Sequence, residues 1–546
     1  MTKGQVAVAL AGFLLPAGAG VVPQGEMRLR LERNFDRLEE EKYRPENVFL
    51  DMKASQGWPG DTEGRTILAL VSDARATGRE PRYLTEILRR LPSRLNARGY
   101  MGPDVSPRMN EQQVSGNGWM LRGLCEFYLW KRKPETLGLI RRLAEGLFLP
   151  AKGRFADYPI DPASRRKGVG GASGSTVAST GDWDLSSDVG CFMIGIDGLV
   201  QARIVLDDPR FDAVIDEAIM RFLQIDLVAI KAQTHATLTG LRALLRYADC
   251  KSGTEANRLV AEAARRFELY TRYGMTENFE NYNWFGRYDT WTEPCAIVDS
   301  YLVALQLWGR TGRTDYLEWA DRIWWNGICR TQRKNGGFGL DTCPGKASGS
   351  RELKVNYPEA HWCCTMRGAE GLAWGSEATA IVRGGRIMLA QYRSANVRLQ
   401  TPSGVVAFEE RSGYPFGGPV EIRFTQVPHE KIALAFFSPS YLDDVGIVWN
   451  GTPVTAETAD GFREVRAAFK PGDRLTFSYV PRSYSLGPQC AENVEAGLER
   501  RMRGPLVLGR GSDGAFKPIH HVMDEAVWDE GSPGPTILFD IIRADN

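Results

Sequence analysis

Two hydrophobic regimes divide this 546-residue chain near residue 380, and they limit the folds that are open to it. From about 28 to 378, apolar residues recur at three- and four-residue spacing, as in Leu137 to Leu143 and Ala296 to Leu307. About a dozen such segments are separated by turns that carry Gly, Pro, Asp and Asn. This number of paired helices favours a closed double ring, an (α/α)6 barrel, over a small bundle.

After about residue 380 the pattern changes to short apolar or alternating runs that are bounded by turns. The runs lie at 386–392, 420–424, 432–437 and 474–480. Asn450-Gly451 and Pro471-Gly472-Asp473 are strong turn signals between them. We therefore predict a barrel domain over 1–379 that is followed by an antiparallel β-sandwich over 380–546.

Composition and charge narrow the classes of function. The chain has 68 Lys+Arg against 67 Asp+Glu, and this balance argues against a nucleic-acid partner, which needs a concentrated basic surface. A hydrophobic content of 43% is ample for a core and excludes a disordered chain. No stretch approaches the roughly 20 apolar residues of a membrane span, so we expect no membrane partner. A homodimer is left open.

The cysteines and the N-terminus bear on the cellular compartment. Nine cysteines are spread along the chain without a disulfide framework, which suggests reduced thiols in a cytosol-like compartment. Val6 to Leu15 follows Lys3 and can be interpreted as a weak signal peptide. We favour the start of a folded domain, because the basic region is a single lysine. The expected location is therefore cytoplasmic, and export remains an alternative.

The strongest chemical pattern joins Glu293-Pro294-Cys295 to a distant His361-Trp362-Cys363-Cys364. Zinc prefers thiolate, imidazole and carboxylate ligands, usually four in a tetrahedron. One carboxylate and three thiolates from these segments would complete the coordination shell of a zinc ion. The ion would link the end of one helix to the start of another. The alternative is that Cys295 and Cys363 are small buried hydrophobic residues, as free cysteines commonly are.

A loop rich in aromatic residues precedes Glu293 and contains two candidate acids, Glu277 and Glu280. Carboxylates beside exposed aromatics such as Trp284 are typical of a sugar-binding surface. In an apolar setting the pKa of Glu277 or Glu280 would be raised, which suits a general acid. The alternative is that either residue is an ordinary solvated glutamate.

Further candidates lie near predicted helix starts and in one long loop. His235 follows Thr234, a probable helix cap, and is either a pocket residue or a satisfied core histidine. Trp58 is a candidate aromatic for sugar binding, and the nearby Asp61 is explained equally well as a helix cap. The longest stretch without helical pattern, Lys152 to Ser187, is expected at the rim of the barrel mouth.

Together these motifs resemble glycoside hydrolase family 127 and its relative family 146, the β-L-arabinofuranosidase group. Four segments in the barrel half look like the family's Glu-x-Cys, His-x-Cys-Cys, His-Ala-x-Thr and Glu-x-Phe motifs. They are Thr292 to Ala296, His361 to Cys364, His235 to Thr237 and Glu277 to Phe279. In the β half, the matching turns and strands are Asn450-Gly451, Gly461-Phe462, Gly472-Asp473 and Arg503 to Val507. The order of these motifs is more specific than any one of them.

The resemblance implies an (α/α)6 barrel followed by β-sandwich domains, and an exo-acting, retaining hydrolase that releases β-L-arabinofuranose. It also implies a Zn²⁺ ion bound by Glu293, Cys295, Cys363 and Cys364. Cys363 would be the nucleophile and Glu277 the general acid/base. Contacts with the sugar would come from His235 and His361, and we add Trp58 and Trp284 as aromatic candidates.

The chain departs from the family pattern in two places that concern the sugar more than the metal. Asn110 to Trp119 has no histidine where family members carry one, and Thr237 follows Ala236 directly. Another terminal sugar, acidic or deoxy, is therefore an alternative. Two rival classes also stay open: a carboxylate-based barrel hydrolase or lyase, and a non-catalytic carbohydrate-binding protein in which zinc is structural.

Overall fold

A computed structural model describes residues 20–49, 58–105, 108–165, 174–495, 498–511 and 514–520, together with the short strands at 537–538 and 542–543. The signal-like segment at Val6 to Leu15 lies outside these residues. So does most of the glycine-rich part of the long loop, 168–175, of which 174 and 175 are described.

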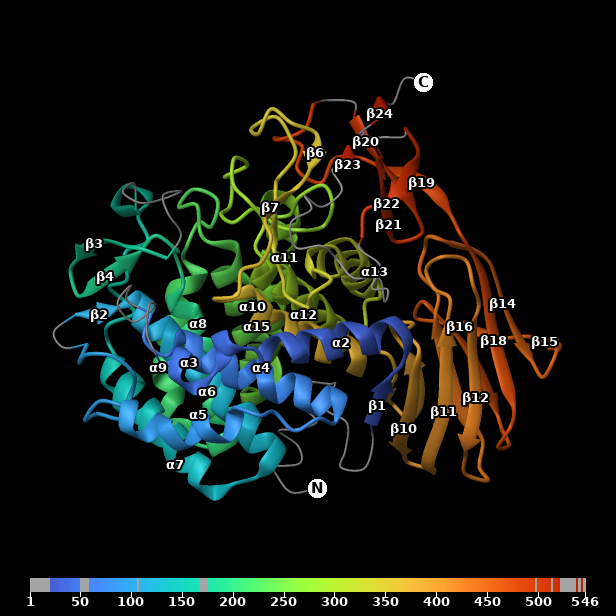
Figure 1. The fold of residues 1–546 in the computed structure, drawn as a ribbon, viewed down its shortest axis with the longest axis horizontal. Helices are drawn as coiled ribbons and strands as arrows, with labels where there is room; N and C mark the ends of the chain where they lie inside the picture. Colours follow the sequence, from blue (N-terminus) through green and yellow to red (C-terminus); the bar gives the residue numbers. More distant parts are fainter. Residues whose placement is uncertain are drawn as a thin grey trace.

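Six consecutive inner helices of the described chain form a closed ring, because each packs against the next and the last returns to the first (Figure 1). They are α4 (Asp61–Thr77), α6 (Glu111–Lys131), α8 (Phe192–Leu206), α10 (Thr234–Tyr247), α12 (Pro294–Thr311) and α15 (Cys364–Glu377). Every residue of α10 is buried, as is the whole of α12 from Pro294 to Trp308. A helix that is buried on all sides belongs to the interior of a large domain.

A second set of helices packs outside this ring. They are α2 (Gly25–Leu38), α5 (Leu84–Arg90), α7 (Pro134–Leu143), α9 (Asp212–Leu223), α11 (Gly253–Tyr273) and α13 (Asp315–Ile323). Their burial follows one stripe, as in α9, where only Val214, Ile215, Ala218, Ile219 and Phe222 are buried. Such amphipathic helices cover the inner ring with their apolar face. The predicted (α/α)6 barrel is confirmed.

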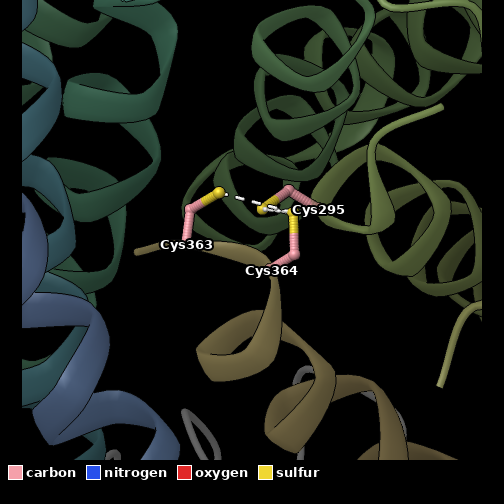
Figure 2. Close-up of side chains that lie close together, drawn as sticks. All are labelled: Cys295, Cys363 and Cys364. Carbon is pink, nitrogen blue, oxygen red and sulfur yellow. Dashed lines mark hydrogen bonds between the residues drawn. The ribbon is translucent and has the colours of Figure 1, made fainter. Parts of the chain in front are cut away.

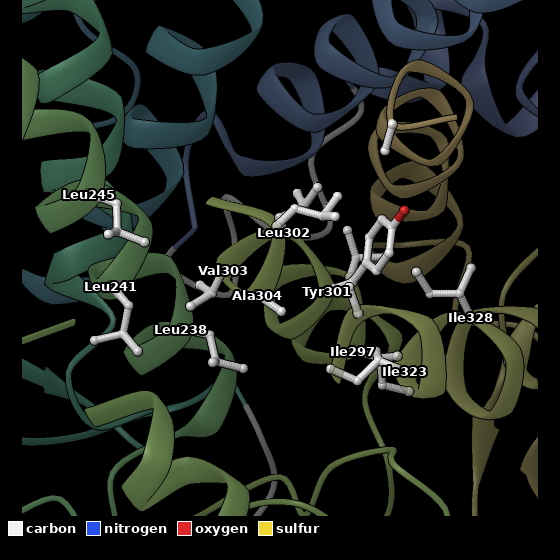
Figure 3. Packing of buried hydrophobic residues seen from close by; sticks show 14 of the residues in the cluster. Leu238, Leu241, Leu245, Ile297, Tyr301, Leu302, Val303, Ala304, Ile323 and Ile328 are labelled. Atoms are coloured by element: carbon white, nitrogen blue, oxygen red, sulfur yellow. The ribbon is translucent and has the colours of Figure 1, made fainter. Parts of the chain in front are cut away.

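Figure 3 shows how the inner helices meet in the core. Leu238, Leu241 and Leu245 lie on one face of α10 and point toward α12, which presents Val303 and Ala304. All of these side chains are fully buried. The three- to four-residue spacing that predicted the helices is therefore the spacing of the residues that hold the barrel together.

The β half begins with a sandwich of two sheets, as predicted. One sheet has the order β1-β10-β11-β12-β18-β14-β15 and the other β16-β17-β13-β9-β8. Phe436 on β13 and Phe477 on β18 stack with ring centroids 5.3 Å apart and join the two sheets. Pairing is antiparallel except between β13 and β9, which are parallel.

The strands of the first sheet are β1 (Gly20–Pro23), β10 (Ala395–Thr401), β11 (Gly404–Ser412), β12 (Val420–Gln426), β14 (Leu442–Trp449), β15 (Thr452–Val454) and β18 (Arg474–Pro481). Those of the second are β8 (Ile381–Arg383), β9 (Arg386–Leu389), β13 (Ile432–Phe437), β16 (Glu457–Ala459) and β17 (Phe462–Ala467). The predicted turn Asn450-Gly451 joins β14 to β15, and both residues have positive φ, 49° and 85°. This matches the hairpin turn that the Asn-Gly pair favours.

A further sheet follows the sandwich, with the order β19-β20-β21-β23-β6. Its main strands are β19 (Ser483–Leu486), β20 (Leu498–Arg503) and β21 (Leu506–Arg510), joined by β22 (Phe516–Pro518), β23 (Ile537–Leu538) and β24 (Ile542–Arg543). Strand β6 (Glu352–Leu353) comes from the helical half, and β1, from the start of the described chain, pairs with β10. The helical half therefore contributes two strands to sheets of the β half, and we retain the division at 379/380 as a proposed domain boundary.

No helix within the described ranges is long and apolar enough to span a membrane. All nine cysteines lie in described residues, and each is a free thiol.

Candidate active site

Two helices of the inner ring begin at the same place, and their first turns carry the predicted ligand residues. Glu293 is the residue before α12 and Cys295 lies in its first turn. Cys363 directly precedes α15, and Cys364 is its first residue. Because a helix N-terminus carries partial positive charge, both ends favour anionic side chains such as thiolates.

The three sulfur atoms lie in contact distance of one another (Figure 2). The Sγ atoms of Cys363 and Cys364 are 3.3 Å apart, and those of Cys295 and Cys364 are 3.6 Å apart. Cys295 and Cys364 are buried, whereas Cys363 is partly exposed. Cysteines that are 69 residues apart in the sequence are thus brought together by the meeting of α12 and α15.

A second group of possible ligands shares Cys295. Donor atoms of His235, Glu293 and Cys295 all lie within 4.8 Å of one another. His235, in the first turn of α10, is held through Nδ1, which lies 2.8 Å from Oδ2 of Asp299. Carboxylate, imidazole and thiolates are the donors that zinc prefers, so the residues present fit this ion.

Burial sets the protonation of these groups. It raises the pKa of the Cys295 and Cys364 thiols well above the usual value. Burial also raises the pKa of Glu293, and the neighbouring Cys363 and Asp188 raise it further. Without a cation, burial therefore favours the neutral forms of these groups, and a bound divalent cation would favour their anionic forms.

The cluster lies at the wall of a cavity of about 470 Å³, a size suited to a small ligand. Cys363, Cys364 and Glu293 line it together with polar and aromatic side chains from several elements. These side chains include Trp58, Asp188, Asn283, Trp291, Tyr357 and Trp362. Tyr357 and Trp362 are 45% and 37% exposed and meet edge to face, so the rim of the cavity is aromatic.

Of the four predicted sugar-binding residues, two line the cavity and two do not. His235 and Trp58 line the cavity, and Nε1 of Trp58 donates to the carbonyl of Gly174 over 3.0 Å. Trp284 does not line it: it is fully buried and packs edge to face against Trp291. His361 is exposed beside Trp362 and is not among the lining residues.

The structure places Glu277, the predicted acid/base, outside both donor groups of the cluster. Its carboxylate accepts hydrogen bonds of 2.8 Å from the backbone N–H groups of Gln489 and Cys490 and lies 3.4 Å from Nε of Arg500. It does not line the cavity. Glu280 is also fully buried outside the cavity, where burial and the nearby Asp341 raise its pKa. The loop chemistry indicated the acids, but not the direction in which they face.

Two smaller predictions also need correction or refinement. Helix α10 begins at Thr234, so this residue is not the cap, and its hydroxyl instead donates to the carbonyl of Tyr282 over 2.8 Å. The stretch from Lys152 to Ser187 is not wholly irregular, because it forms the hairpin β3 (Thr176–Thr180) and β4 (Trp183–Ser186). Gly174, from this stretch, lines the cavity.

Three charged residues of the site were not predicted. Arg65 pairs with Asp61 over 3.0 Å, and its Nη1 and Nη2 lie 3.6 Å from Sγ of Cys295 and 3.4 Å from Nε2 of His235. Asp188 lines the cavity. Asp299 follows Cys295 by four positions on a predicted helix, a spacing that puts both on one face and could have revealed it. No comparable signal marked Asp188.

The comparisons agree with this architecture. Residues 386–480 match the sequence model of the GH127 middle domain of β-L-arabinofuranosidases. The GH127 β-arabinofuranosidase BT3674 shares the fold with a TM-score of 0.66 at 14% identity, covering 91% of this chain and 85% of that one. Ara127N, a GH127 β-L-arabinofuranosidase from Geobacillus stearothermophilus T6, gives 0.66 at 12%, covering 91% and 86%. No curated protein sequence matches the chain significantly.

The fold is that of a class of scaffolds with an (α/α)6 barrel and a β-sandwich, which the GH127 structures above share, and residues 386–480 match the middle domain of that family. Within this class the predicted resemblance to glycoside hydrolase family 127 is confirmed.

Proposed function

We propose that this protein is a retaining exo-glycoside hydrolase in which the thiolate of Cys363 is the nucleophile, and that it releases terminal β-L-arabinofuranose. One observation carries the proposal: sulfur atoms from two distant segments meet at the wall of a cavity, and the partly exposed one belongs to Cys363. The match to the GH127 middle domain supports the family and the sugar.

Glu293, Cys295, Cys363 and Cys364 would hold a Zn²⁺ ion, since together they offer one carboxylate and three thiolates. When bound, zinc keeps a coordinating thiol deprotonated at neutral pH, where a free thiol with a pKa of about 8.5 is mostly protonated. The pKa values of Cys295 and Cys364, which burial raises, increase the need for such a cation.

The reaction then takes two steps at Cys363. Its sulfur attacks the anomeric carbon, the glycosidic C–O bond breaks, and an acid in the cavity gives its proton to the departing oxygen. In the second step the residue that gave its proton to the leaving group acts as a base. It takes a proton from water as the water oxygen attacks the anomeric carbon. The C–S bond breaks, the thiolate returns, and the sugar leaves with retained configuration.

Asp188 is the acid/base that the geometry supports best. It is nearly fully buried, lines the cavity, and lies close enough to Glu293 to raise the pKa of that carboxyl. A buried acid in a cavity can hold the proton that the leaving group needs. Glu277, which the family resemblance implies, would need its carboxylate released from Gln489 and Cys490 before it could act.

The aromatic side chains supply the sugar-binding surface. Trp58 and Trp291 line the cavity, and Tyr357 and Trp362 stand at its rim. Flat apolar rings with polar neighbours such as Asn283 and His235 suit the alternating faces of a saccharide. A reducing, cytoplasmic location is proposed as well, because the nine free thiols include the three of the cluster.

A screen of aryl glycosides on protein of known metal content, with and without a chelator, tests the proposal. We expect hydrolysis of an aryl β-L-arabinofuranoside by the zinc-loaded protein and loss of that activity with the chelator. Product analysis early in the reaction should show retained configuration. Full activity in metal-free protein, or inversion, would contradict the mechanism.

One observation favours a second candidate, a carboxylate-based hydrolase or lyase without a metal. Arg65 already places a positive charge against Cys295 and His235, and Asp61 and Asp188 line the same cavity. The same screen separates it, since this enzyme would be active after chelation. Zinc and sugar binding without hydrolysis would instead indicate the non-catalytic class.

A further inference from the structure

Five donor residues surround the point where α12 and α15 meet, one more than a tetrahedral zinc site requires. Cys295, Cys363 and Cys364 form one compact group, and His235, Glu293 and Cys295 form the other. Cys295 belongs to both, so the two groups lie side by side and share this donor. In the proposed function the sulfur of Cys363 loses its negative charge when it bonds to a sugar, so it would then be a poorer ligand, and a fifth donor could replace it.

His235 is oriented by a buried network that leaves one ring nitrogen facing the cluster. Its Nδ1 lies 2.8 Å from Asp299, whose carboxylate also accepts from Arg242 over 2.7 Å and Arg367 over 2.5 Å. Asp299 also accepts from the hydroxyl of Thr239 over 2.9 Å. A carboxylate held by two guanidinium groups accepts hydrogen bonds, so Nδ1 carries the proton and Nε2 carries the lone pair.

The contacts of Arg65 show where that lone pair points. Its guanidinium lies 3.4 Å from Nε2 of His235 and 3.6 Å from Sγ of Cys295. The group is held in place by Asp61 and stacks over the ring of Trp119. One guanidinium group contacts both atoms, so Nε2 of His235 and Sγ of Cys295 face the same side, and a metal ion bound there would displace Arg65 from Nε2.

From this arrangement we infer that His235 is a metal ligand, which completes a shell of His235, Glu293, Cys295 and Cys364 when Cys363 is bonded to the sugar. The inference rests on the proposed function and assigns His235 a different role from sugar contact. Cys295 and Cys364 are buried and fixed in the first turns of their helices, whereas Cys363 is partly exposed to the cavity. His235 would then replace Cys363, so four protein donors would remain available throughout the reaction.

The other histidine near the cluster provides a matched control. His361 is two positions before Cys363, but its ring is exposed beside Trp362. Among the described residues, it is not part of either donor group. Loss of His361 should therefore leave metal binding unchanged, although it lies nearer than His235 to the cluster in the sequence.

Zinc affinity, measured by competition with a chromophoric chelator, tests the inference without any assay of hydrolysis. The set comprises the wild type, Cys363→Ser, His235→Ala and the double variant Cys363→Ser/His235→Ala. Each single variant should bind one zinc ion within about tenfold of the wild type, because four donors remain. The double variant should bind at least about 100-fold more weakly, since loss of a residue that only supports a ligand already costs about 10- to 100-fold. Cys363→Ser/His361→Ala should behave as Cys363→Ser does.

Cobalt substitution gives an independent reading of the ligands. Co²⁺ in the Cys363→Ser protein should keep the intense visible bands of a four-coordinate site with fewer thiolate charge-transfer bands. His235→Ala in that background should shift these visible bands, because a water would take the place of the imidazole nitrogen. Circular dichroism and thermal unfolding establish that each variant is folded. Equal zinc affinity of the double variant and Cys363→Ser would overturn the inference. A wild type without zinc affinity would instead overturn the proposed function.

Discussion

Glu293 and Glu277 belong to one short stretch of chain, yet the fold gives them different surroundings. Glu293 precedes α12 and lines the cavity beside Cys363 and Cys364. Glu277 faces the C-terminal sheet, where the backbone of Gln489 and Cys490 binds its carboxylate. A ligand at a helix start is positioned by the helix itself, whereas a loop acid is positioned by whatever packs against it.

The largest effect is expected from loss of the proposed nucleophile in the cysteine cluster beside Glu293. Cys363→Ser should reduce kcat for an aryl furanoside by about 10⁴-fold or more, since it removes the nucleophile. Steady-state kinetics on folded, metal-analysed protein measures it. Cys250→Ser is the matched control, because Cys250 is also a partly exposed thiol but lies outside the cluster. Full activity of Cys363→Ser would exclude the proposed nucleophile.

Asp188→Asn tests which carboxylate is the acid. We expect a loss of about 10²- to 10⁴-fold in kcat, the usual contribution of a general acid/base. The loss should be largest for poor leaving groups, because these depend most on protonation. A series of aryl glycosides with leaving groups of different pKa measures this. An equal loss across the series would assign Asp188 a binding role instead.

The pH dependence of zinc affinity tests the electrostatics of the cluster. Burial raises the pKa values of Cys295 and Cys364, so both thiols are protonated at neutral pH in the metal-free protein. Zinc must displace those protons, and affinity should rise with pH by about tenfold per unit for each proton released. Calorimetry in buffers of different ionisation enthalpy counts the protons. Affinity that is independent of pH would contradict thiolate ligation.

Glu277→Gln tests whether the loop carboxylate has a structural role. The substitution should lower stability more than catalytic activity. The buried carboxylate accepts two backbone hydrogen bonds and faces Arg500, so the free energy of unfolding should fall by about 1–2 kcal/mol. Chemical denaturation measures this, and kcat should stay within about threefold of the wild type. A loss of activity as large as that of Asp188→Asn would restore Glu277 as the acid.

The smallest effect concerns the aromatic rim. Trp362→Ala should raise KM for a disaccharide substrate roughly fivefold, because an aromatic contact contributes about 1 kcal/mol. It should leave kcat nearly unchanged. Phe416→Ala is the control, since Phe416 is another exposed aromatic residue, 46% exposed, and does not line the cavity. Equal effects of the two substitutions would show that the rim does not bind substrate.

Local sequence patterns were enough to predict the architecture and the donor chemistry. Helical spacing over 28–378 and alternation after 380 are local properties of the chain, and local hydrophobic patterns fix which face of an element is buried. The Glu-x-Cys and Cys-Cys segments likewise specified ligands that zinc prefers. Asp299 was within reach of the same reasoning, because it lies one helical turn after Cys295.

Which side chains face the cavity depends on contacts between residues that are far apart in the sequence. The contact of Glu277 with Gln489 spans 212 residues, and that of Arg65 with Cys295 spans 230. Loop residues have no periodicity to indicate their direction, and a hydrogen-bond partner so distant in sequence leaves no local pattern. The buried face of a helix is set by residues that are near one another in the sequence. A buried loop carboxylate instead turns toward the hydrogen-bond donors that satisfy its charge, and these donors can lie far away in the sequence.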